Sequence, residues 1–337
     1  MNLLELDLDQ IKNFVEKLTE APYRARQIFS WIYQKQATEF DSMSDLPKSL
    51  RKKLKDSASL ETFPSIHPVP CADRSFKFKF VLKDNLAIES VLMYERNRLT
   101  ACLSTQVGCA MGCKFCATGY MKFRRNLTSG EIVNQVLALQ KYAGQQKITN
   151  LVYMGMGEPL INYENVVKSI QILQSPFGFS IAPRRITVST CGIVPGIEKL
   201  SASGLKVILA ISLHAPNDKL RDQIMPINRH YNIKSLLKVA EDYYRLNKKR
   251  PTFEYVLIGG LNDHPEEARE LADVLKNIPC KINLIPFNPI KFVKFNRPDP
   301  DRIEKFRKIL QDPMRVVTVR NTKGRDINAA CGQLCIE

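Results

Sequence analysis

The feature that most constrains the fold of this chain is a regular alternation of short β-rich runs and longer helical patterns from about residue 98 onward. Apolar and β-branched runs predict six strands, at residues 99–104, 151–154, 186–190, 207–213, 253–258 and 282–285. Helices are predicted between them, at residues 131–142, 163–173, 236–246 and 265–276, and Thr128 and Glu131 form a capping pair before the first. Six βα units predict an α/β barrel of parallel strands, open or closed. Its functional groups should collect in the loops that follow the strands.

A run of three cysteines, Cys109, Cys113 and Cys116 in the pattern CxxxCxxC, directly follows the first of these strands. A structural zinc site needs four ligands, usually from two pairs, and the sequence offers no second pair. Two-cluster ferredoxins carry cysteine runs such as C-x2-C-x2-C-x3-C, and the sequence contains no such run. Three thiolates suit a 4Fe–4S cluster in which one iron stays open to another ligand. The alternatives are a structural metal knuckle and three reduced thiols in the core.

The other cysteines argue against a disulfide framework. The chain has nine cysteines, an odd number, and its first residues are acidic where a signal peptide would be basic. Cys71, Cys191 and Cys280 are scattered, which is typical of small buried apolar side chains. No apolar run approaches the roughly 20 residues that cross a bilayer. We therefore expect a cytoplasmic protein.

The charge of the chain favours a polyanionic partner. Fifty Lys and Arg against 34 Asp and Glu give a net charge of +16, and a basic protein binds phosphates through charge neutralisation and counterion release. Nucleic acid is the expected partner. Basic residues gather in several clusters, at residues 24–26, 48–55, 122–125, 184–185 and 248–250.

Four regions are expected along the chain. Residues 1–65 carry an apolar stripe at helical spacing, including Leu3, Ile11 and Val15, and predict a helical accessory module. Its basic clusters at 24–26 and 48–55 make this module the expected RNA-binding element. Residues 66–97 predict a linker and a β extension, because prolines precede alternating runs at 76–82 and 87–94. Residues 98–290 form the barrel. Residues 291–337 form a C-terminal segment.

Several motifs point to one family. The cysteine run, with Phe115 before its last cysteine, resembles the radical SAM superfamily. Other segments resemble the RlmN/Cfr family of RNA adenosine methyl synthases, namely GMGEP (155–159), ITVST (186–190), SLHAPND (212–218), MPIN (225–228), NLIPFNP (283–289) and DINAACGQL (326–334). The resemblance runs from residue 23 to residue 334. Asn328 departs from the family pattern, where Asp is commoner.

The resemblance implies a partial (βα)6 TIM-like radical SAM barrel with a small N-terminal helical domain and a β extension. It implies two cofactors, a 4Fe–4S cluster held by Cys109, Cys113 and Cys116, and S-adenosylmethionine (SAM), of which two molecules are used per turnover. Carbon 2 of adenine is electron-poor and cannot attack a methyl sulfonium, so the family uses a radical route. An external one-electron reductant of the flavodoxin type and a monomeric state are also expected.

Three catalytic roles follow from the resemblance. Cys331, in the AACGQL motif, corresponds to the cysteine that first carries the methyl group, whose methylene radical then adds to the ring. Cys102 corresponds to a thiol that removes a proton from the adduct and then forms a disulfide with Cys331, which frees the product. Glu89 corresponds to a proton acceptor near the adenine. Taken without the resemblance, these are a C-terminal thiol, a thiol on a strand and an outward-facing glutamate.

The resemblance also assigns the contacts with SAM. Gly157 and Glu158 would provide close backbone approach and a carboxylate for the methionine ammonium group, and Phe115 would pack beside the adenine. The full set of expected SAM-binding residues is Gly157, Glu158, Ser189, Ser212, Leu213, His214 and Asn288. For His214, a structural role at a strand end is the alternative.

Three functions compete at this stage. The first is methylation of carbon 2 of an adenosine in the peptidyl-transferase centre of 23S rRNA and, in some members, of a tRNA adenosine next to the anticodon. The second is modification of carbon 8 of the same rRNA base. The third is a non-catalytic RNA-binding factor for ribosome assembly. The complete set of cysteines argues against the third, and GMGEP and residues 320–326 look more like the first.

Overall fold

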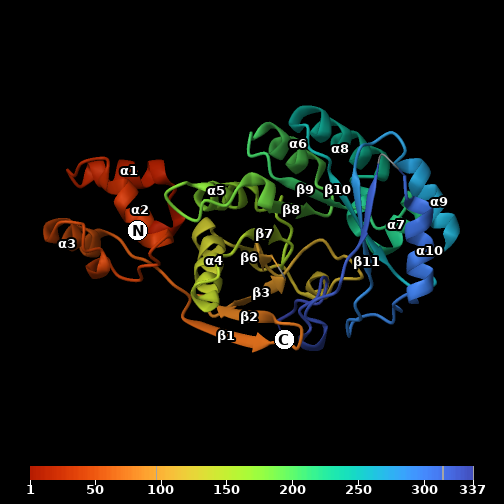
Figure 1. The fold of residues 1–337 in the computed structure, drawn as a ribbon, viewed down its shortest axis with the longest axis horizontal. Coiled ribbons are helices and arrows are strands. Elements are labelled where there is room, and N and C mark those ends of the chain that lie inside the picture. Colours follow the sequence, from red (N-terminus) through yellow and green to blue (C-terminus); the bar gives the residue numbers. More distant parts are fainter. Residues whose placement is uncertain (96, 313–314, 337) are drawn as a thin grey trace.

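The computed structural model describes residues 1–95, 97–312 and 315–336. The strands are β1 (Ser65–Pro70), β2 (Ser75–Val81), β3 (Ala87–Glu95), β4 (Arg98–Cys102), β5 (Gln106–Val107), β6 (Arg125–Asn126), β7 (Asn150–Tyr153), β8 (Ile186–Thr190), β9 (Ile208–Ser212), β10 (Thr252–Leu257), β11 (Lys281–Pro286) and β12 (Val316–Val319). The helices are α1 (Leu8–Lys17), α2 (Arg24–Tyr33), α3 (Lys48–Ser57), α4 (Ser129–Ala143), α5 (Tyr163–Gln174), α6 (Val194–Ala202), α7 (Asp218–Ile224), α8 (Ile233–Asn247), α9 (Pro265–Val274) and α10 (Pro300–Leu310). Figure 1 shows their arrangement.

One sheet runs through the whole molecule in the order β1-β2-β3-β4-β7-β8-β9-β10-β11-β12. The pairs from β1 to β4 are antiparallel, and those from β4 to β12 are parallel. Residues from eight of these strands, β3, β4 and β7 to β12, line a single cavity, so the sheet curves around its inner face. The predicted α/β partial barrel is confirmed. The six predicted strands correspond to β4, β7, β8, β9, β10 and β11.

The strand β12 was not predicted. Its four residues pair in parallel with β11 and alternate between exposed and half-buried, so they lack the apolar signal of a central strand. The helices α6, α7 and α10 were also not predicted. Both α6 and α10 begin with proline in their first turn, which is compatible with a helix start because that N–H has no partner inside the helix.

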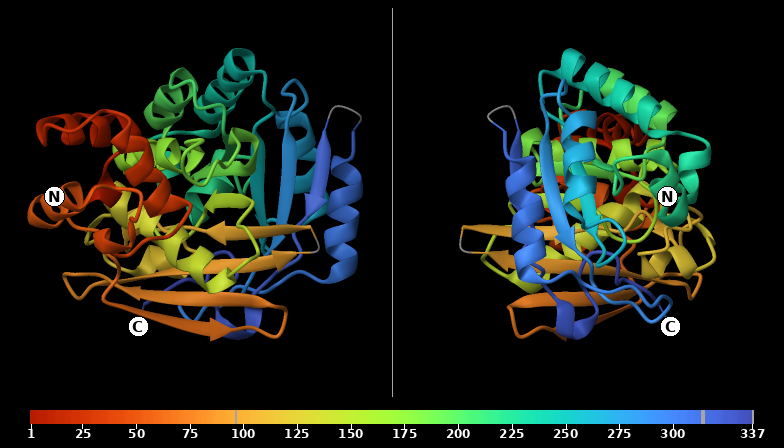
Figure 2. Two further views of the ribbon diagram at one scale, coloured as in Figure 1. Left: turned by 60° about the vertical axis from the view of Figure 1, so that its left-hand side comes forward. Right: turned by 90° about the vertical axis from the view of Figure 1, so that its right-hand side faces the viewer.

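The helices cover the outer face of the parallel strands (Figure 2). The predicted cap of α4 is present, since Glu131 N donates to Thr128 Oγ1 (3.2 Å) and Thr128 N donates to Glu131 Oε2 (2.9 Å). This reciprocal pair satisfies two donors at the start of the helix. Within the described residues, no helix combines the length and apolar character that would let it cross a membrane.

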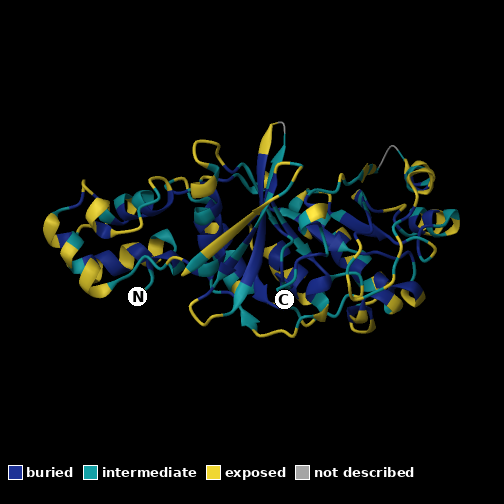
Figure 3. Ribbon diagram, turned by 90° about the horizontal axis from the view of Figure 1, so that it is seen from below, coloured by how far each residue is buried: buried dark blue, intermediate teal, exposed yellow. Residues whose placement is uncertain are grey.

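The β extension continues the barrel sheet, because β3 pairs with β4. Residues 65–70, which were expected to be linker, form the edge strand β1, and most of this strand is exposed (Figure 3). Pro68 and Pro70 are tolerated there because an edge strand leaves one side of its backbone unpaired.

The N-terminal helices lie at one end of the molecule, opposite α10 (Figure 1). Their predicted stripe is buried, with Leu3, Ile11 and Val15 at 0% exposure. The module packs onto the barrel helices: Ser129 Oγ donates to the Glu5 carbonyl (3.3 Å), and a Cβ on Gly130 would lie 2.6 Å from Glu5 Cγ. The division of the chain into four regions stays a prediction, although its first boundary coincides with the start of β1.

Candidate functional site: two cavities that share a cysteine

The three predicted cluster ligands lie on one loop, residues 108–116, which we call the three-cysteine loop. Gly108 opens it at φ +73°, and a Cβ there would lie 2.1 Å from the Lys122 carbonyl oxygen, so only glycine fits. Lys114 N donates to the Ile224 carbonyl (3.0 Å), and Ala117 N donates to the Gly332 carbonyl (2.7 Å). The loop is therefore held by α7 on one side and by the C-terminal segment on the other.

Burial controls the ionisation of these thiols. It raises the pKa of Cys109 to about 12, and it raises the pKa of Cys113 and Cys116 as well, because a thiolate loses its hydration and each neighbouring thiolate repels it. The bare thiols are therefore neutral near pH 7. A cationic iron centre would reverse this, because coordinated thiols ionise.

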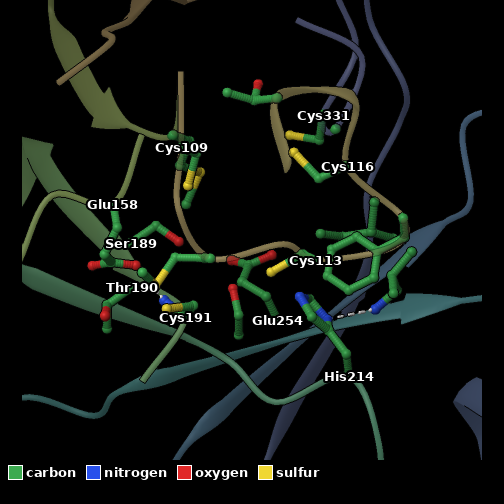
Figure 4. A pocket seen from close by; sticks show the side chains of 18 of the residues that line it. Cys109, Cys113, Cys116, Glu158, Ser189, Thr190, Cys191, His214, Glu254 and Cys331 are labelled. Carbon is green, nitrogen blue, oxygen red and sulfur yellow. Dashed lines mark hydrogen bonds between the residues drawn. The ribbon is translucent and has the colours of Figure 1, made fainter. Parts of the chain in front are cut away.

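A cavity of about 160 Å³ lies against this loop and contains most of the predicted SAM-binding residues. Figure 4 shows Cys109 near Glu158 and Ser189 on one side of the cavity, Cys116 and Cys331 on the other side, and Cys113 between them. The predicted residues that line it are Cys109, Cys113, Cys116, Gly157, Glu158, Ser189, Ser212, His214 and Asn288. Leu213 does not line it; this side chain is fully buried, although it is next to Ser212 and His214.

The GMGEP turn brings a buried carboxylate to the cavity. Gly157 has φ +98°, and a Cβ would lie 2.5 Å from Gln106 Cβ, so the turn requires glycine. Glu158 is 3% exposed and accepts from Cys191 N at Oε2 (2.7 Å) and from Leu160 N at Oε1 (3.0 Å). Burial raises the pKa of Glu158, and these two bonds lower it. The carboxylate is thus fixed at the cavity wall, as a partner for a ligand cation requires.

The structure favours a structural role for His214. Its Nδ1 accepts from Val256 N (2.9 Å), and its ring packs edge-on against Phe115 of the three-cysteine loop, with centroids 4.6 Å apart. Burial lowers the pKa of His214 to about 3, so the ring is neutral. His214 therefore supports the three-cysteine loop through its contact with Phe115, and it also lines the cavity.

A second cavity, of about 770 Å³, occupies the inside of the barrel. Cys102, at the end of β4, and Cys331 both line it, and Cys331 also lines the first cavity. Burial, with the nearby Cys331, raises the pKa of Cys102 to about 12, and the charge of Arg320 opposes this increase. The structure thus brings together two cysteines that are 229 positions apart in the sequence.

The last part of the predicted C-terminal segment, residues 320–336, holds Cys331 at the wall of both cavities. From here on, the C-terminal segment means these residues. Asn288 Nδ2 donates to the Cys331 carbonyl (3.1 Å), Gln333 Nε2 donates to the Pro289 carbonyl (2.8 Å), and Thr118 Oγ1 donates to the Leu334 carbonyl (2.6 Å). Gly332 has φ +83°, and a Cβ there would lie 3.0 Å from the Phe115 carbonyl oxygen. The backbone of the segment is thus in direct contact with the three-cysteine loop.

A cluster of contacts between residues 71–74 and 323–326, which we call the clip, fixes the start of this segment. Asp326 accepts from the Cys71 thiol (2.5 Å) and from Ala72 N (3.2 Å). Asp73 Oδ2 accepts from Gly324 N (2.8 Å), and Lys323 Nζ donates to the Asp73 carbonyl (3.2 Å). The turn between β1 and β2 therefore anchors the chain just before Cys331.

Glu89 lies on β3, on the same face as the cavity-lining Val91, but it lines neither cavity. Lys77 Nζ lies 3.0 Å from its Oε1, and Cys335 N donates to its Oε2 (3.0 Å). Burial raises the pKa of Glu89, and both contacts lower it. In this conformation Glu89 binds the C-terminal segment, and its predicted role near the adenine stays a prediction.

Comparison with known proteins places these features in one family. The model of the ribosomal RNA large subunit methyltransferase N-terminal domain matches residues 1–60, and the radical SAM superfamily model matches residues 103–272. A probable dual-specificity RNA methyltransferase RlmN of Dictyoglomus thermophilum is 47% identical over 99% of this chain and 96% of its own length. The chain belongs to the RlmN family of radical SAM methyltransferases.

Two other RlmN-family similarities cover the whole chain. The dual-specificity RNA methyltransferase RlmN of Desulfotalea psychrophila is 45% identical over 100% of this chain and 95% of its own length. The crystal structure of a radical SAM methyltransferase from Sphaerobacter thermophilus superposes with a TM-score of 0.95 at 44% identity, over 99% of both chains. The predicted family and fold class are confirmed.

As a member of the RlmN family, the chain uses a 4Fe–4S cluster and SAM, and the residues present fit both. Within the described residues, no three side chains converge closely enough to hold a single metal ion. A cubane cluster has a separate iron for each thiolate, so its ligands need not converge on one point. Three partly buried thiols around a cavity whose wall also holds a fixed carboxylate suit a cluster together with a ligand that carries an ammonium group.

Sequence reasoning missed three charged side chains at this site. Arg221 is fully buried and donates to the carbonyls of Cys191 (2.8 Å) and Ser212 (3.0 Å), so it ties together two loops of the first cavity. Glu254 and Arg320 line both cavities. Burial raises the pKa of Glu254, whereas the charge of Arg320 and a hydrogen bond from Asn283 lower it. A lone glutamate inside the apolar run FEYVLI was the signal that could have identified Glu254.

Proposed function

We propose that this chain methylates carbon 2 of an adenosine in the peptidyl-transferase centre of 23S rRNA and of a tRNA adenosine next to the anticodon. One observation carries the proposal: Cys331 forms part of the wall of both cavities, while Cys102 lines only the second. A thiol in that position can receive a methyl group from SAM in the first cavity and transfer it to an RNA base in the second. The dual specificity in the relatives' names supports a second RNA substrate.

The cluster and SAM, when bound, supply the methyl group and the radical chemistry. The protein contributes position and charge. Cys331 accepts the methyl group, and the guanidinium of Arg320 brings a positive charge to the cavity wall that holds both Cys331 and Cys102. Asn288, through the Cys331 carbonyl, holds the backbone of the carrier in place. The dry cavity walls keep water away from reactive carbon centres.

Cys102 completes the reaction. Once the base is joined to Cys331 through a methylene, the Cys102 sulfur takes the proton from the substituted ring carbon, and then attacks the Cys331 sulfur. An S–S bond forms, the S–C bond breaks, and its electron pair passes to the methylene carbon, which takes up a proton to become methyl. Burial raises the pKa of Cys102, and the charge of Arg320 opposes this increase, which favours the thiolate that the step requires. The disulfide must afterwards be reduced by an external thiol.

Exposed aromatic and basic side chains near the cavities support RNA binding. Tyr120 and Phe292 stack with ring centroids 4.7 Å apart, and both are exposed, as is Phe123 between Lys122 and Arg124. Aromatic faces beside cations are typical of surfaces that stack unpaired bases and contact phosphates. We assign the N-terminal module to RNA binding as well, through exposed residues of α3 such as Lys48 and Lys52.

The remaining partners follow from this assignment. We propose a monomeric cytoplasmic enzyme, because ribosomal RNA and tRNA are its substrates. A flavodoxin-like protein would deliver single electrons to the cluster. The basic net charge of +16 supports recognition of an acidic RNA surface.

The test is nucleoside mass spectrometry of a 23S rRNA fragment and of tRNA after anaerobic incubation with reconstituted enzyme, reductant and SAM. 2-Methyladenosine in both RNAs is the expected result. 8-Methyladenosine would show that carbon 8 is methylated and not carbon 2. Unmodified RNA with an intact cluster would overturn the proposal.

A further inference from the structure

A chain of hydrogen bonds crosses the inner face of three strands and ends at the second cavity. Thr318 Oγ1 on β12 donates to Asn283 Oδ1 on β11 (3.1 Å), and Asn283 Nδ2 donates to Glu254 Oε2 on β10 (2.7 Å). An ionised carboxylate only accepts, which directs the Asn283 NH2 group toward Glu254. Glu254 is 5% exposed and lines both cavities. Among the described residues no hydrogen bond reaches its Oε1, which is left as an oriented acceptor.

Arg320 provides a donor beside this acceptor. Its backbone N donates to the Leu284 carbonyl (2.8 Å), which fixes its position after β12. Its guanidinium makes a long contact with Met154 Sδ (3.7 Å) and no ion pair with any described residue. Arg320 lines both cavities, and its charge acts on Glu254, Cys102 and Cys331. The cavity therefore presents, side by side, an acceptor, a donor and a pair of thiols.

The same order occurs along the edge of adenine. The exocyclic amine at carbon 6 is a donor, the adjacent ring nitrogen N1 is an acceptor, and carbon 2 follows. An acceptor facing the amine and a donor facing N1 would leave carbon 2 toward the thiols. The opposite edge offers the amine, N7 and carbon 8 in the same order, so this pair selects an amino-purine and does not by itself select the carbon.

We propose that Glu254 and Arg320 recognise the target base, with Glu254 accepting a hydrogen bond from the adenine amine and Arg320 donating to the ring nitrogen next to the carbon that is methylated. This specificity role rests on the proposed function. Glu254 is better placed for it than Glu89, because both oxygens of Glu89 are occupied by Lys77 and the Cys335 amide.

The decisive variant is Glu254→Gln. Asn283 Nδ2 donates to Glu254 Oε2, and the new amide keeps that bond by placing its oxygen toward Asn283 and its NH2 group toward the cavity. The acceptor thereby becomes a donor, with almost no change in shape. Glu241→Gln is the matched control, since Glu241 is exposed on α8, pairs with Arg245 and lines neither cavity.

The measurement is a single-turnover comparison of two RNA fragments that differ only at the target base, adenosine or purine riboside, which lacks the amine. We expect the wild type and Glu241→Gln to prefer adenosine by about 10- to 100-fold, the size of one hydrogen bond to a charged group. We expect Glu254→Gln to lose or reverse that preference. The quantity compared is the ratio of the rates with adenosine and with purine riboside. A general loss of folded enzyme lowers both rates equally and leaves this ratio unchanged.

Other outcomes are distinguishable. An unchanged ratio in Glu254→Gln would overturn the inference while leaving the proposed function intact. Weaker SAM binding in Glu254→Gln, measured by equilibrium dialysis, together with an unchanged ratio would assign the carboxylate to the first cavity and also overturn it. A wild type that assembles its cluster but modifies neither RNA refutes the proposed function instead.

Discussion

The three-cysteine loop and the C-terminal segment bring cysteines to the same site in opposite ways. The loop carries its three thiols within eight residues, and its own glycine and backbone bonds shape it. The C-terminal segment carries Cys331 near the end of the chain, and side chains and carbonyls of distant loops and of the clip hold it in place. The spacing of the three loop thiols is thus set by local sequence, whereas the position of Cys331 depends on long-range contacts.

The largest expected effect separates the two regions. Cys113→Ala removes a loop thiol and should abolish both cluster assembly and methylation. Cys331→Ala should abolish methylation equally while leaving the iron content and the cluster absorbance at the wild-type level. Iron analysis, visible spectra and nucleoside mass spectrometry measure these effects. Loss of the cluster in Cys331→Ala would show that the two regions are not independent.

The next effect concerns the second thiol of the barrel. Cys102→Ala should lower product formation by about 10²- to 10⁴-fold, the range for removal of an acid–base group. RNA should remain covalently attached to Cys331, visible as a slow band on a denaturing gel. Cys280→Ala, a buried cysteine outside both cavities, is the control and should form product normally. A Cys102 variant with neither product nor adduct would contradict the proposed role.

A third prediction concerns His214, which supports the three-cysteine loop, and the dependence of stability on pH. The folded pKa of His214 is about 3, against 6.5 for an ordinary histidine, so between these values the unfolded chain binds a proton that the folded chain does not. Stability should therefore fall as the pH drops below about 6.5, by up to ~1.4 kcal/mol per pH unit for one proton. His214→Asn should remove that dependence in urea unfolding between pH 7 and 5. The exposed His230→Asn is the control, and an equal slope in both variants would argue against a neutral His214.

The smallest expected effect is at the clip. Asp326→Asn weakens the contacts with Cys71 and the Ala72 amide at an exposed position. We expect limited proteolysis of the C-terminal segment to be faster by a few-fold, with the cluster unchanged. Asp301→Asn, on an exposed turn of α10, serves as the comparison. If both variants are cleaved at the wild-type rate, the clip does not hold the segment.

The elements with strong periodicity could be predicted from the sequence. The strands β4 and β7 to β11, the β2–β3 hairpin and the cap of α4 all follow from local patterns. The strand β1 was missed because two prolines suggested a linker, and β12 was missed because its exposed alternate residues hide the apolar signal. Both lie at the edges of the sheet, where burial imposes the weakest pattern.

The same distinction applies to the site. The three-cysteine loop is visible in the sequence because its ligands are close together. The pairing of Cys102 with Cys331 came only from family resemblance, since no local rule relates positions so far apart. Glu254 and Arg320 were overlooked because their neighbours, Asn283 and Met154, lie on other strands. Tertiary structure alone gives such residues their chemical meaning.

The clip also connects the two ends of the curved sheet. The sheet ends at β1 on one side and at β12 on the other, and these two edges are not joined by strand pairing. The contacts between residues 71–74, in the turn after β1, and residues 323–326, which follow β12, connect the two ends. Opening that seam breaks a few side-chain and amide contacts and leaves every strand pair of the sheet in place. The two ends of the sheet are therefore held together by side-chain and amide contacts, which can break without disrupting the strand pairing around the cavity.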